Sequence, residues 1–435
     1  YTSEFLLNNN APNTLNIILD AYGEGLSGAI YMGQGKNIKL LKEFDTSSSL
    51  GLLYSGITEW SGFKPNEDEY KVMALAGYGE GVFVDFIEEN IIQFNESSLD
   101  ISINSNYFNF EDSGKGTITD AFNKQFGNLK NNKPILEQQN ILNCICSFQF
   151  VIEKTIISLI SSLLIIHADT NQVFLSGGLF HNSKLVGEIT RNINTKILVS
   201  PSPGDAGSSI GASYFAMLCL GKKYKNKNES PFLGPKIPSL KNYSHLFSEL
   251  KLENTYLKIL DILSNDEIFA VFSGYSEVGP RALLSRSLCC NGKSTVALEY
   301  LNTKIKKREI FRPIAPVIHK KYALDNFEIN DESVQNSFWM GQLIWPKINS
   351  KLNRQPFYHV DGSVRAQIFD NDSDLLKKFV PKLIQRLLNE GHIIANTSLN
   401  ISGDPMVFLP EDLYLNCKRL EVKYVLQDNL LFEAL

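Results

Sequence analysis

The sequence predicts an α/β protein with two domains. Its 435 residues are enough to form more than one hydrophobic core. Two stretches, residues 173–182 and 197–207, each join an apolar strand to a glycine-rich turn and then to a helix. A Lys- and Asn-rich run that ends in prolines, residues 221–239, is typical of a linker. We therefore expect one domain over residues 1–220 and another over residues 240–435.

The composition excludes some classes of partner. Hydrophobic residues make up 43% of the chain and charged residues 20%, the usual balance of a globular protein. A net charge of −5 argues against a dedicated binder of nucleic acid or of membrane surfaces, so we expect neither partner. The six cysteines include no C-x-x-C pair, and reduced thiols in the cytoplasm are the simplest interpretation. The apolar run at residues 155–166 is short and interrupted by serines, so it predicts a buried helix.

The first elements of the chain surround an aspartate. Residues 15–33 predict a hairpin, in which an apolar run ends at Asp20 and a glycine-rich turn leads to a second run. Asp20 suits a carboxylate that faces a phosphate or a metal, and it equally suits a turn residue that bonds its own backbone. Residues 49–60 predict a helix with a serine cap. Lys71 and Glu69 follow, either ordering a loop over a nucleotide or lying at the surface.

The rest of the first domain leads to the two glycine-rich turns. Residues 80–135 are polar and Asn-rich, which predicts short strands in an insertion without chemistry, and residues 137–166 predict a long helix. Glycines at a strand-to-helix turn let backbone N–H groups approach a phosphate, and the helix N-terminus favours anions. Asp205 stands at the tip of the second turn. We interpret His181, in the first turn, as a substitution and not as a ligand.

A basic stretch, residues 278–316, dominates the second domain. Arg281 follows Gly-Pro and Arg312 precedes Pro, and prolines restrict the backbone on both sides of the peptide bond. Arginines on rigid corners suit planar, bidentate recognition of phosphate or carboxylate oxygens. For Arg308 and its neighbouring lysines, a solvated helix face is an equally good interpretation. We expect an anion site built on the two proline-flanked arginines.

Three buried strands are expected to surround that site. They are predicted at residues 267–274, 359–367 and 391–400. Arg365, on the second of them, is expected to join the anion site. Asp361, on the same strand, suits either a structural or a catalytic role.

The same motifs carry a family resemblance. In the second domain they are EVGPRALLSRS, LNTKIKKREIFRPIAP, HVDGSVRAQ and ANTSLNISGDPMV, and in the first they are DAYGE, EYKVMALAGYG, SGGLFHN and PGDAG. Together they resemble the natural-product O-carbamoyltransferases, which carbamoylate nodulation factors, aminoglycosides and cephamycins. Small departures from the family pattern are Ala21 and Ala74, both in place of glycine, and His181.

The resemblance implies a fold and a set of site residues. The first domain would be an actin-like ATPase (ribonuclease H-like) domain, and the second a threonylcarbamoyl-adenylate-synthase-like α/β domain. The implied residues fall into four groups. The catalytic group is Arg281, Lys306, Arg312 and Arg365. The carbamoyl-phosphate and adenylate group is Arg286, Asn396 and Ser398. The nucleotide group is Gly23, Lys71, Gly177, Gly178, Asn182 and Gly204. The metal ligands are Asp20 and Asp205.

One element of the family pattern is absent from this sequence. The family has an H-x-x-x-H pair of metal ligands just before its D-G-x-G-E motif, whereas no two histidines here are four residues apart. We expect that the chain lacks the N-terminal portion of the ATPase domain, and a degenerate domain is the alternative. Hard oxygen ligands are compatible with Mg or Mn, and two added histidines would favour Fe(II).

The resemblance also implies the chemistry. Carbamoyl phosphate and ATP would give carbamoyl-adenylate in the second domain, and the carbamoyl group would then pass to a hydroxyl of a small molecule or glycan in the first. Two alternatives stay open: a tRNA threonylcarbamoylation-type protein, and an inactive, truncated ATP-binding paralogue. The identity of the acceptor is beyond the reach of the sequence.

Overall fold

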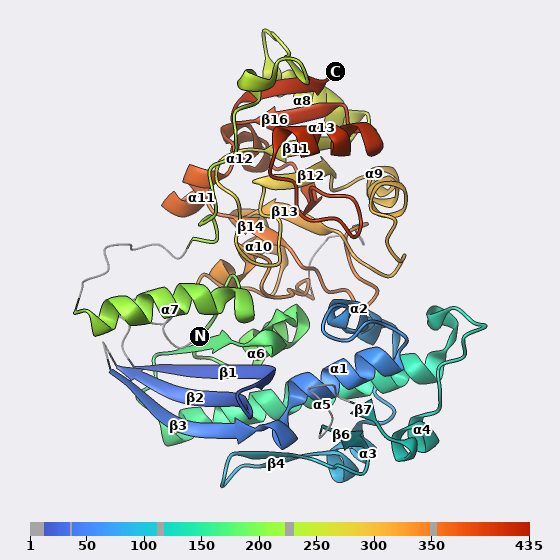
Figure 1. The fold of residues 1–435 in the computed structure, drawn as a ribbon, viewed down its shortest axis with the longest axis vertical. Helices are drawn as coiled ribbons and strands as arrows, with labels where there is room; N and C mark the ends of the chain where they lie inside the picture. Colours follow the sequence, from blue (N-terminus) through green and yellow to red (C-terminus); the bar gives the residue numbers. More distant parts are fainter. Residues whose placement is uncertain (1–12, 35–36, 111–116, 222–229, 349–354) are drawn as a thin grey trace. The chain divides into compact units, whose positions relative to one another are not determined.

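The computed structural model describes residues 13–34, 37–110, 117–221, 230–348 and 355–435. The chain divides into two compact units, Tyr1–Glu229 and Ser230–Leu435. Both units mix helices and sheets, so the α/β class expected from the sequence is confirmed (Figure 1). Residues 222–229 of the expected linker lie outside the described residues. Ile237, near the end of that segment, is buried in the core of the second unit.

The first unit is built on a five-stranded sheet with strand order β3-β2-β1-β8-β9. The first three strands are antiparallel, whereas β8 and β9 run parallel to β1. Their bounds are β1 Thr14–Gly23, β2 Leu26–Gln34, β3 Asn37–Asp45, β8 Gln172–Ser176 and β9 Lys196–Val199. The expected hairpin at residues 15–33 is therefore confirmed. Because β8 pairs directly with β1, the glycine-rich turn after β8 lies beside the end of the first strand.

Helices complete the first unit. They are α1 Leu50–Trp60, α2 Glu69–Leu75, α3 Val84–Asn90, α4 Asp120–Phe126, α5 Gln139–Ile166, α6 Ser183–Asn192 and α7 Asp205–Cys219. The Ser49 hydroxyl accepts a hydrogen bond from the backbone N–H of Leu52, so the predicted cap of α1 is confirmed. Short strands β4 Ile92–Asn95, β5 Asp100–Ile103, β6 Phe108–Asn109 and β7 Thr117–Ile118 lie in the insertion.

The insertion packs on α5 through aromatic rings. Phe122 and Phe126 of α4 lie 5.7 and 5.6 Å from Phe148 of α5, measured between ring centroids. By length and composition alone α5 is the one described helix that could cross a membrane, and half of its apolar window is buried inside the unit. Gln149 and Glu153 on its buried face make polar contacts within the unit.

The second unit is built on an eight-stranded sheet with strand order β10-β17-β16-β11-β12-β15-β13-β14. The strands are β10 Phe247–Glu249, β11 Phe269–Phe272, β12 Arg286–Asn291, β13 Ala315–His319, β14 Gln367–Phe369, β15 Ile394–Ser398, β16 Tyr424–Gln427 and β17 Leu430–Ala434. The helices are α8 Thr255–Ser264, α9 Thr295–Glu299, α10 Lys320–Asn326, α11 Asp374–Phe379, α12 Lys382–Asn389 and α13 Pro410–Arg419.

Both faces of this sheet are buried. Successive residues of β11 alternate between two hydrophobic cores: Phe269 lies in one core, and Ala270 and Phe272 lie in the other. This alternation is what a strand covered on both sides requires, because neighbouring side chains point to opposite faces. Two expected strands, around β11 and β15, are confirmed.

The strand expected at residues 359–367 is wrong for most of its length. Regular strand begins only at Gln367, and the preceding residues form a turn held by Asp361. The Asp361 carboxylate accepts from the Ser363 hydroxyl at 2.6 Å and from the Ser363 backbone N–H at 3.1 Å. Its second neighbour is Nδ1 of His359 at 3.1 Å. These short-range bonds compete with the strand ladder and explain the alternating polar residues.

Candidate functional site

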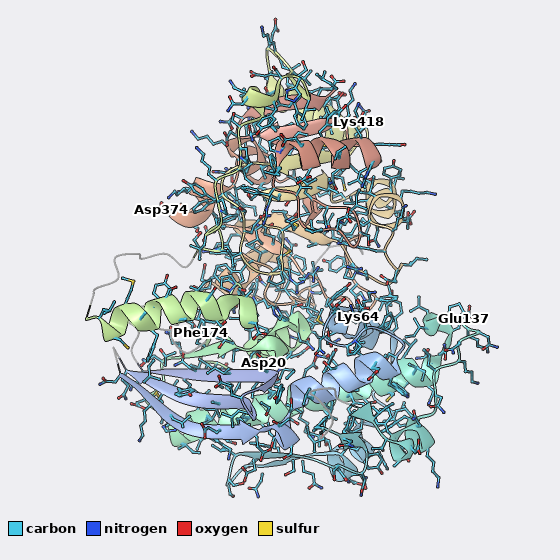
Figure 2. The ribbon with its side chains drawn as sticks, in the orientation of Figure 1. Asp20, Lys64, Glu137, Phe174, Asp374 and Lys418 are labelled. Carbon is cyan, nitrogen blue, oxygen red and sulfur yellow. The ribbon has the colours of Figure 1, made fainter. Side chains whose placement is uncertain are left out.

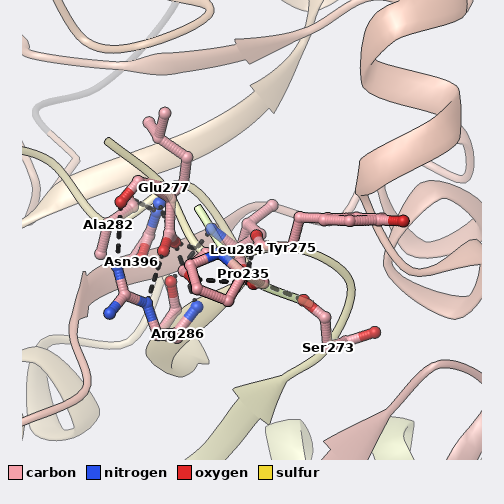
Figure 3. Close-up of polar contacts among 12 residues, drawn as sticks. Pro235, Ser273, Tyr275, Glu277, Ala282, Leu284, Arg286 and Asn396 are labelled. Carbon is pink, nitrogen blue, oxygen red and sulfur yellow. Dashed lines mark hydrogen bonds and ion pairs between the residues drawn. The ribbon is translucent and has the colours of Figure 1, made fainter. Parts of the chain in front are cut away.

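The loop between β11 and β12 is closed by a buried carboxylate. The side chain of Glu277 is 1% exposed, and its Oε1 accepts from the backbone N–H groups of Leu283, Ser285 and Arg286 at 3.0, 3.2 and 3.1 Å. Its Oε2 accepts from Nε of Arg286 at 2.9 Å, and Arg286 also donates to the Glu277 carbonyl at 3.0 Å (Figure 3). The loop is therefore fixed by one ion pair and three backbone hydrogen bonds.

The same loop is tied to β15, the neighbour of β12 in the sheet. Nδ2 of Asn396, on β15, donates to the Ala282 carbonyl at 2.8 Å (Figure 3). The same nitrogen donates to Oε1 of Gln367 at 2.7 Å. Ala282 follows Arg281 directly, and Gln367 lies two residues after Arg365. The amide of Asn396 thus connects the neighbourhoods of two arginines that are 84 residues apart in sequence (365 − 281).

Five cationic side chains gather in the second unit, and we call them the cation cluster. They are Arg281, Lys306, Arg308, Arg312 and Arg365. Burial, and then the charges of Arg281, Arg308 and Arg312, lower the pKa of Arg365 well below its usual value. Burial alone lowers the pKa of Arg281 to about 10. Several mutually repelling cations in a partly buried place are what a small polyanion site requires.

Lys306 is the most buried member of the cluster, at 2% exposure. Its Nζ lies within hydrogen-bond distance of four oxygens at the end of β15: the carbonyl and hydroxyl of Ser398, and the carbonyl and Oδ1 of Asn400. Burial, followed by the charges of Arg308 and Arg312, lowers its pKa to about 7. Lys306 thus fixes the end of β15, and it holds Ser398 beside the cluster.

Unsatisfied polar atoms mark the same region. Among the described residues, buried Nε of Arg365 and buried Oδ1 of both Asn302 and Asn396 have no hydrogen-bond partner. Buried polar groups are nearly always paired in native proteins, and an orphan costs about 1–3 kcal/mol. One donor and two acceptors without partners therefore indicate a place where a polar ligand binds.

Close backbone approach shapes the expected nucleotide site in the first unit. A Cβ on Gly178 would lie 2.6 Å from Oδ1 of Asp20, and one on Gly177 would lie 2.1 Å from the Leu19 carbonyl. Gly177 has a φ of +98°, which favours glycine. Figure 2 marks Asp20 on the first unit. The two glycines thus bring the turn after β8 against the carboxylate at the end of β1.

The second glycine-rich turn joins the first. Gly177 donates from its backbone N–H to the Pro203 carbonyl at 2.6 Å, and a Cβ on Gly204 would lie 2.6 Å from Nε2 of His181. His181 therefore packs on the turn that precedes Asp205, which is exposed at the start of α7. Within the part of the chain that the structure describes, no three His, Cys, Asp or Glu side chains form a metal-binding group.

Asn182, a predicted nucleotide ligand, is part of a buried network. Its Oδ1 caps α6 by accepting from the Leu185 N–H at 3.0 Å, and its Nδ2 donates to Oε1 of Gln149 at 2.9 Å. The hydroxyl of Tyr54 donates to the same Gln149 oxygen at 2.8 Å, and Gln149 donates to Glu153 at 2.7 Å. This network positions the turn after β8 against α1 and α5.

The remaining predicted nucleotide residues lie at the edge of this site. Gly23 ends β1 and is exposed. Lys71, on α2, forms an ion pair with Asp68 at 3.1 Å and lies 5.4 Å from the ring centroid of Phe63. Lys71, which was expected either to order a loop over a nucleotide or to lie at the surface, is thus held by contacts with residues of its own segment.

The structure thus places four predicted catalytic residues, Arg281, Lys306, Arg312 and Arg365, near enough for their charges to act on Arg365 or Lys306. It places Arg286 differently, in an ion pair with Glu277. Sequence reasoning left Arg308 undecided and gave Glu277 no role. The apolar residues that follow Glu277 could have indicated its structural role, because a carboxylate beside a buried loop needs hydrogen-bond partners.

Comparison with known proteins gives a consistent family. The family described as "Carbamoyltransferase N-terminus" matches residues 1–214, and that described as "Carbamoyltransferase C-terminus" matches residues 260–434. An uncharacterised protein of Synechocystis is 29% identical, over 95% of this chain and 71% of that protein. The nodulation protein NolNO of Sinorhizobium fredii is 28% identical, over 91% of this chain and 57% of that protein.

A relative with a stated activity covers a shorter part. The 3'-hydroxymethylcephem-O-carbamoyltransferase of Streptomyces clavuligerus is 27% identical, over 53% of this chain and 42% of that protein. The chain thus spans about half the length of NolNO and of the cephem enzyme. A crystal structure of full-length HypF in its phosphate- and nucleotide-bound form aligns with 40% of this chain and 21% of that chain at 17% identity. Its TM-score of 0.29 is too low to bear on the fold.

Proposed function

Because this chain belongs to the carbamoyltransferase family, we propose that it carries the catalytic sites of an ATP-dependent O-carbamoyltransferase. The cation cluster would bind carbamoyl phosphate, and the glycine-rich turns of the first unit would bind a nucleotide. The observation that carries the proposal is the convergence of four guanidinium groups and Lys306 beside buried polar atoms without partners. Arg312 also pairs with Glu309 at 3.3 Å, and a bound dianion would offset the repulsion that remains among the cations.

The reaction would proceed in three balanced steps. Water and carbamoyl phosphate give carbamate and inorganic phosphate. A carbamate oxygen attacks the α-phosphorus of ATP, so pyrophosphate leaves and carbamoyl-adenylate forms. A hydroxyl oxygen then attacks the carbonyl carbon, AMP leaves, and the hydroxyl loses its proton. The arginines would stabilise the negative charge that develops on the phosphoryl oxygens.

The acceptor is proposed by chemical class only. The printed name of the Streptomyces clavuligerus relative describes transfer to a hydroxymethyl group, and other relatives are nodulation proteins. A hydroxyl of a small molecule or of a glycan is the acceptor that these names share. The absence of disulfides among the six cysteines, all of them described, supports the proposed cytoplasmic location.

The first unit would supply the nucleotide-binding surface. Three antiparallel strands followed by two parallel ones, with glycine-rich turns after β8 and β9, support an actin-like ATPase arrangement. The second unit, with arginines at the ends of its mixed sheet, supports a threonylcarbamoyl-adenylate-synthase-like domain. Backbone N–H groups at Gly177, Gly178 and Gly204 would approach the nucleotide phosphates.

The divalent metal fits the described residues only in part. Asp20 and Asp205 offer hard oxygen ligands that suit Mg, Mn or Fe(II), yet no third His, Cys, Asp or Glu joins them in the described part of the chain. A complete site would need further ligands. The steps proposed above are therefore derived from this chain's own residues and not from a metal.

Pyrophosphate release tests the proposal. Arg312→Ala should abolish the release that depends on carbamoyl phosphate, because it removes a guanidinium from the cation cluster. Arg419→Ala removes an exposed arginine at the end of α13 and should leave the release unchanged. Near-normal release by Arg312→Ala would contradict the proposal, and so would the same loss in both variants.

A further inference from the structure

We propose that Glu277 is a positioning residue of the cation cluster and that Arg286 is its counter-ion, with no contact to the bound anion. The inference rests on the proposed function of the cluster as an anion site. It assigns the buried carboxylate the task of holding the loop that presents Arg281. It also takes Arg286 out of the set of anion ligands.

The Glu277 carboxylate accepts several hydrogen bonds from the loop at once. Oε1 of Glu277 accepts from three successive parts of the loop, at Leu283, Ser285 and Arg286. Without this oxygen the three backbone donors would be buried without a partner, since water does not reach a side chain that is 1% exposed. The carboxylate therefore determines the conformation of the loop.

The backbone of the loop is strained at Leu284. Leu284 is fully buried and has a φ of +72°, a left-handed conformation that a non-glycine residue adopts only when its surroundings impose it. The bonds from Glu277 to Leu283 and Ser285 flank this residue on both sides. The Leu284 N–H donates to the Ser287 hydroxyl at 3.0 Å, which completes the restraint. Release of Glu277 would let the loop relax to an ordinary conformation.

The loop is connected to the cation cluster through Asn396. The Ala282 carbonyl, next to Arg281, accepts from Asn396 (Figure 3). Asn396 also donates to Gln367. A shift of the loop would therefore move Arg281 and would release the amide of Asn396 at the same time. Both changes would alter the place where the anion is expected.

Arg286 is the counter-ion of the Glu277 carboxylate. Nε of Arg286 donates to Oε2 of Glu277, and Nη2 donates to the Glu277 carbonyl. With its side chain 13% exposed, Arg286 directs two of its nitrogens at one residue. If Arg286 were removed alone, a buried carboxylate without its counter-ion would remain close to an anion site, which is unfavourable for both. If both charges were removed, that repulsion would disappear.

A double-mutant cycle tests the inference, with calorimetric binding of inorganic phosphate to the full chain as the measurement. Glu277→Gln keeps an oxygen for the backbone donors, so the loop should hold and phosphate should bind within about threefold of the wild type. Glu277→Met removes that oxygen and should bind phosphate about tenfold more weakly. Arg286→Met should also weaken binding, because it leaves the carboxylate without its counter-ion. The double variant Glu277→Gln, Arg286→Met should bind more tightly than Arg286→Met alone. Arg286→Lys keeps the charge but cannot make both contacts to Glu277, so its affinity should lie between those of the wild type and Arg286→Met.

Three results would overturn the inference. Equal phosphate affinity in Glu277→Met and Glu277→Gln would show that the carboxylate does not position the cluster. A double variant that binds more weakly than Arg286→Met alone, or a loss in Arg286→Lys as large as in Arg286→Met, would contradict the counter-ion role of Arg286. The exposed pair Arg386–Glu390 gives a matched control, and Arg386→Met and Glu390→Gln should not affect binding. A wild type that binds no phosphate would contradict the proposed function itself.

Discussion

Nζ of Lys306 lies 2.7 Å from Oδ1 of Asn400, and this contact joins the basic stretch to the end of β15. Three further oxygens lie within hydrogen-bond distance of the same nitrogen. The oxygens favour the ammonium form, whereas burial and the charges of Arg308 and Arg312 lower its pKa to about 7. The protonation of Lys306 is therefore balanced near neutral pH.

That balance predicts pH-dependent anion binding. Below pH 7 Lys306 is an ammonium group and adds one positive charge to the cation cluster, and this charge is lost as the pH rises through about 7. Affinity for sulfate, a dianion that does not titrate in this range, should therefore fall between pH 6.5 and 8.5, by about tenfold. Because a bound dianion favours the charged form, binding near pH 8 should take up protons, which calorimetry in buffers of different ionisation enthalpy measures.

Lys306→Met should bind sulfate weakly at every pH and should lose the dependence. Lys241→Met, at an exposed lysine of the same unit, should keep it. A dependence that persists in Lys306→Met would assign the titration to another group and contradict this role of Lys306.

Asn302 should be needed to present Arg312. Its Nδ2 donates to the Arg312 carbonyl at 3.1 Å, and its carbonyl accepts from the Arg308 N–H at 3.0 Å. Asn302→Ala would remove the first bond at a buried site, so we expect a loss of about 1–2 kcal/mol in the free energy of unfolding and weaker phosphate binding. Asn326→Ala removes a similar side-chain bond outside the cluster and should cost stability without changing phosphate affinity. Equal phosphate affinity in both variants would contradict the role of Asn302.

Gly178→Ala tests the turn against Asp20. The added Cβ would lie 2.6 Å from Oδ1 of Asp20, so the carboxylate must move. We expect ATP affinity to fall about tenfold because the packed turn has no room to adjust. In Gly81→Ala the new Cβ meets a Val84 methyl at 3.2 Å, in the insertion, and ATP affinity should stay unchanged. Unaltered ATP binding by Gly178→Ala would separate the turn from the nucleotide site.

Much of the fold could be predicted because its signals are local. The hairpin of β1 and β2, the cap at Ser49 and the helix α5 each follow from periodicity or capping within a few residues. The short helices α3 and α4, of seven residues each, were missed because a segment of that length shows little periodicity. The turn at Asp361 was predicted as a strand, because the polar residues that form its hydrogen bonds alternate along the chain as they would in a strand.

The site was predictable in its residue types but not in its pairings. Arg281 and Arg312 were marked by the prolines beside them, and the structure places both within the cation cluster. The pairing of Arg286 with Glu277 depends on how a loop folds back on itself, which no local pattern encodes. The sequence left open whether Arg308 is a solvated residue. Its neighbours Lys307 and Ile310 are exposed, as a solvated face would require.

A crystal structure of the chain soaked with carbamoyl phosphate and ATP is the most direct test of the cation cluster. The account predicts phosphate or adenylate density within hydrogen-bond distance of the Arg281 and Arg365 guanidinium groups, with Arg286 still bonded to Glu277. Clear ligand density elsewhere in the second unit, with those two arginines unoccupied, would contradict it.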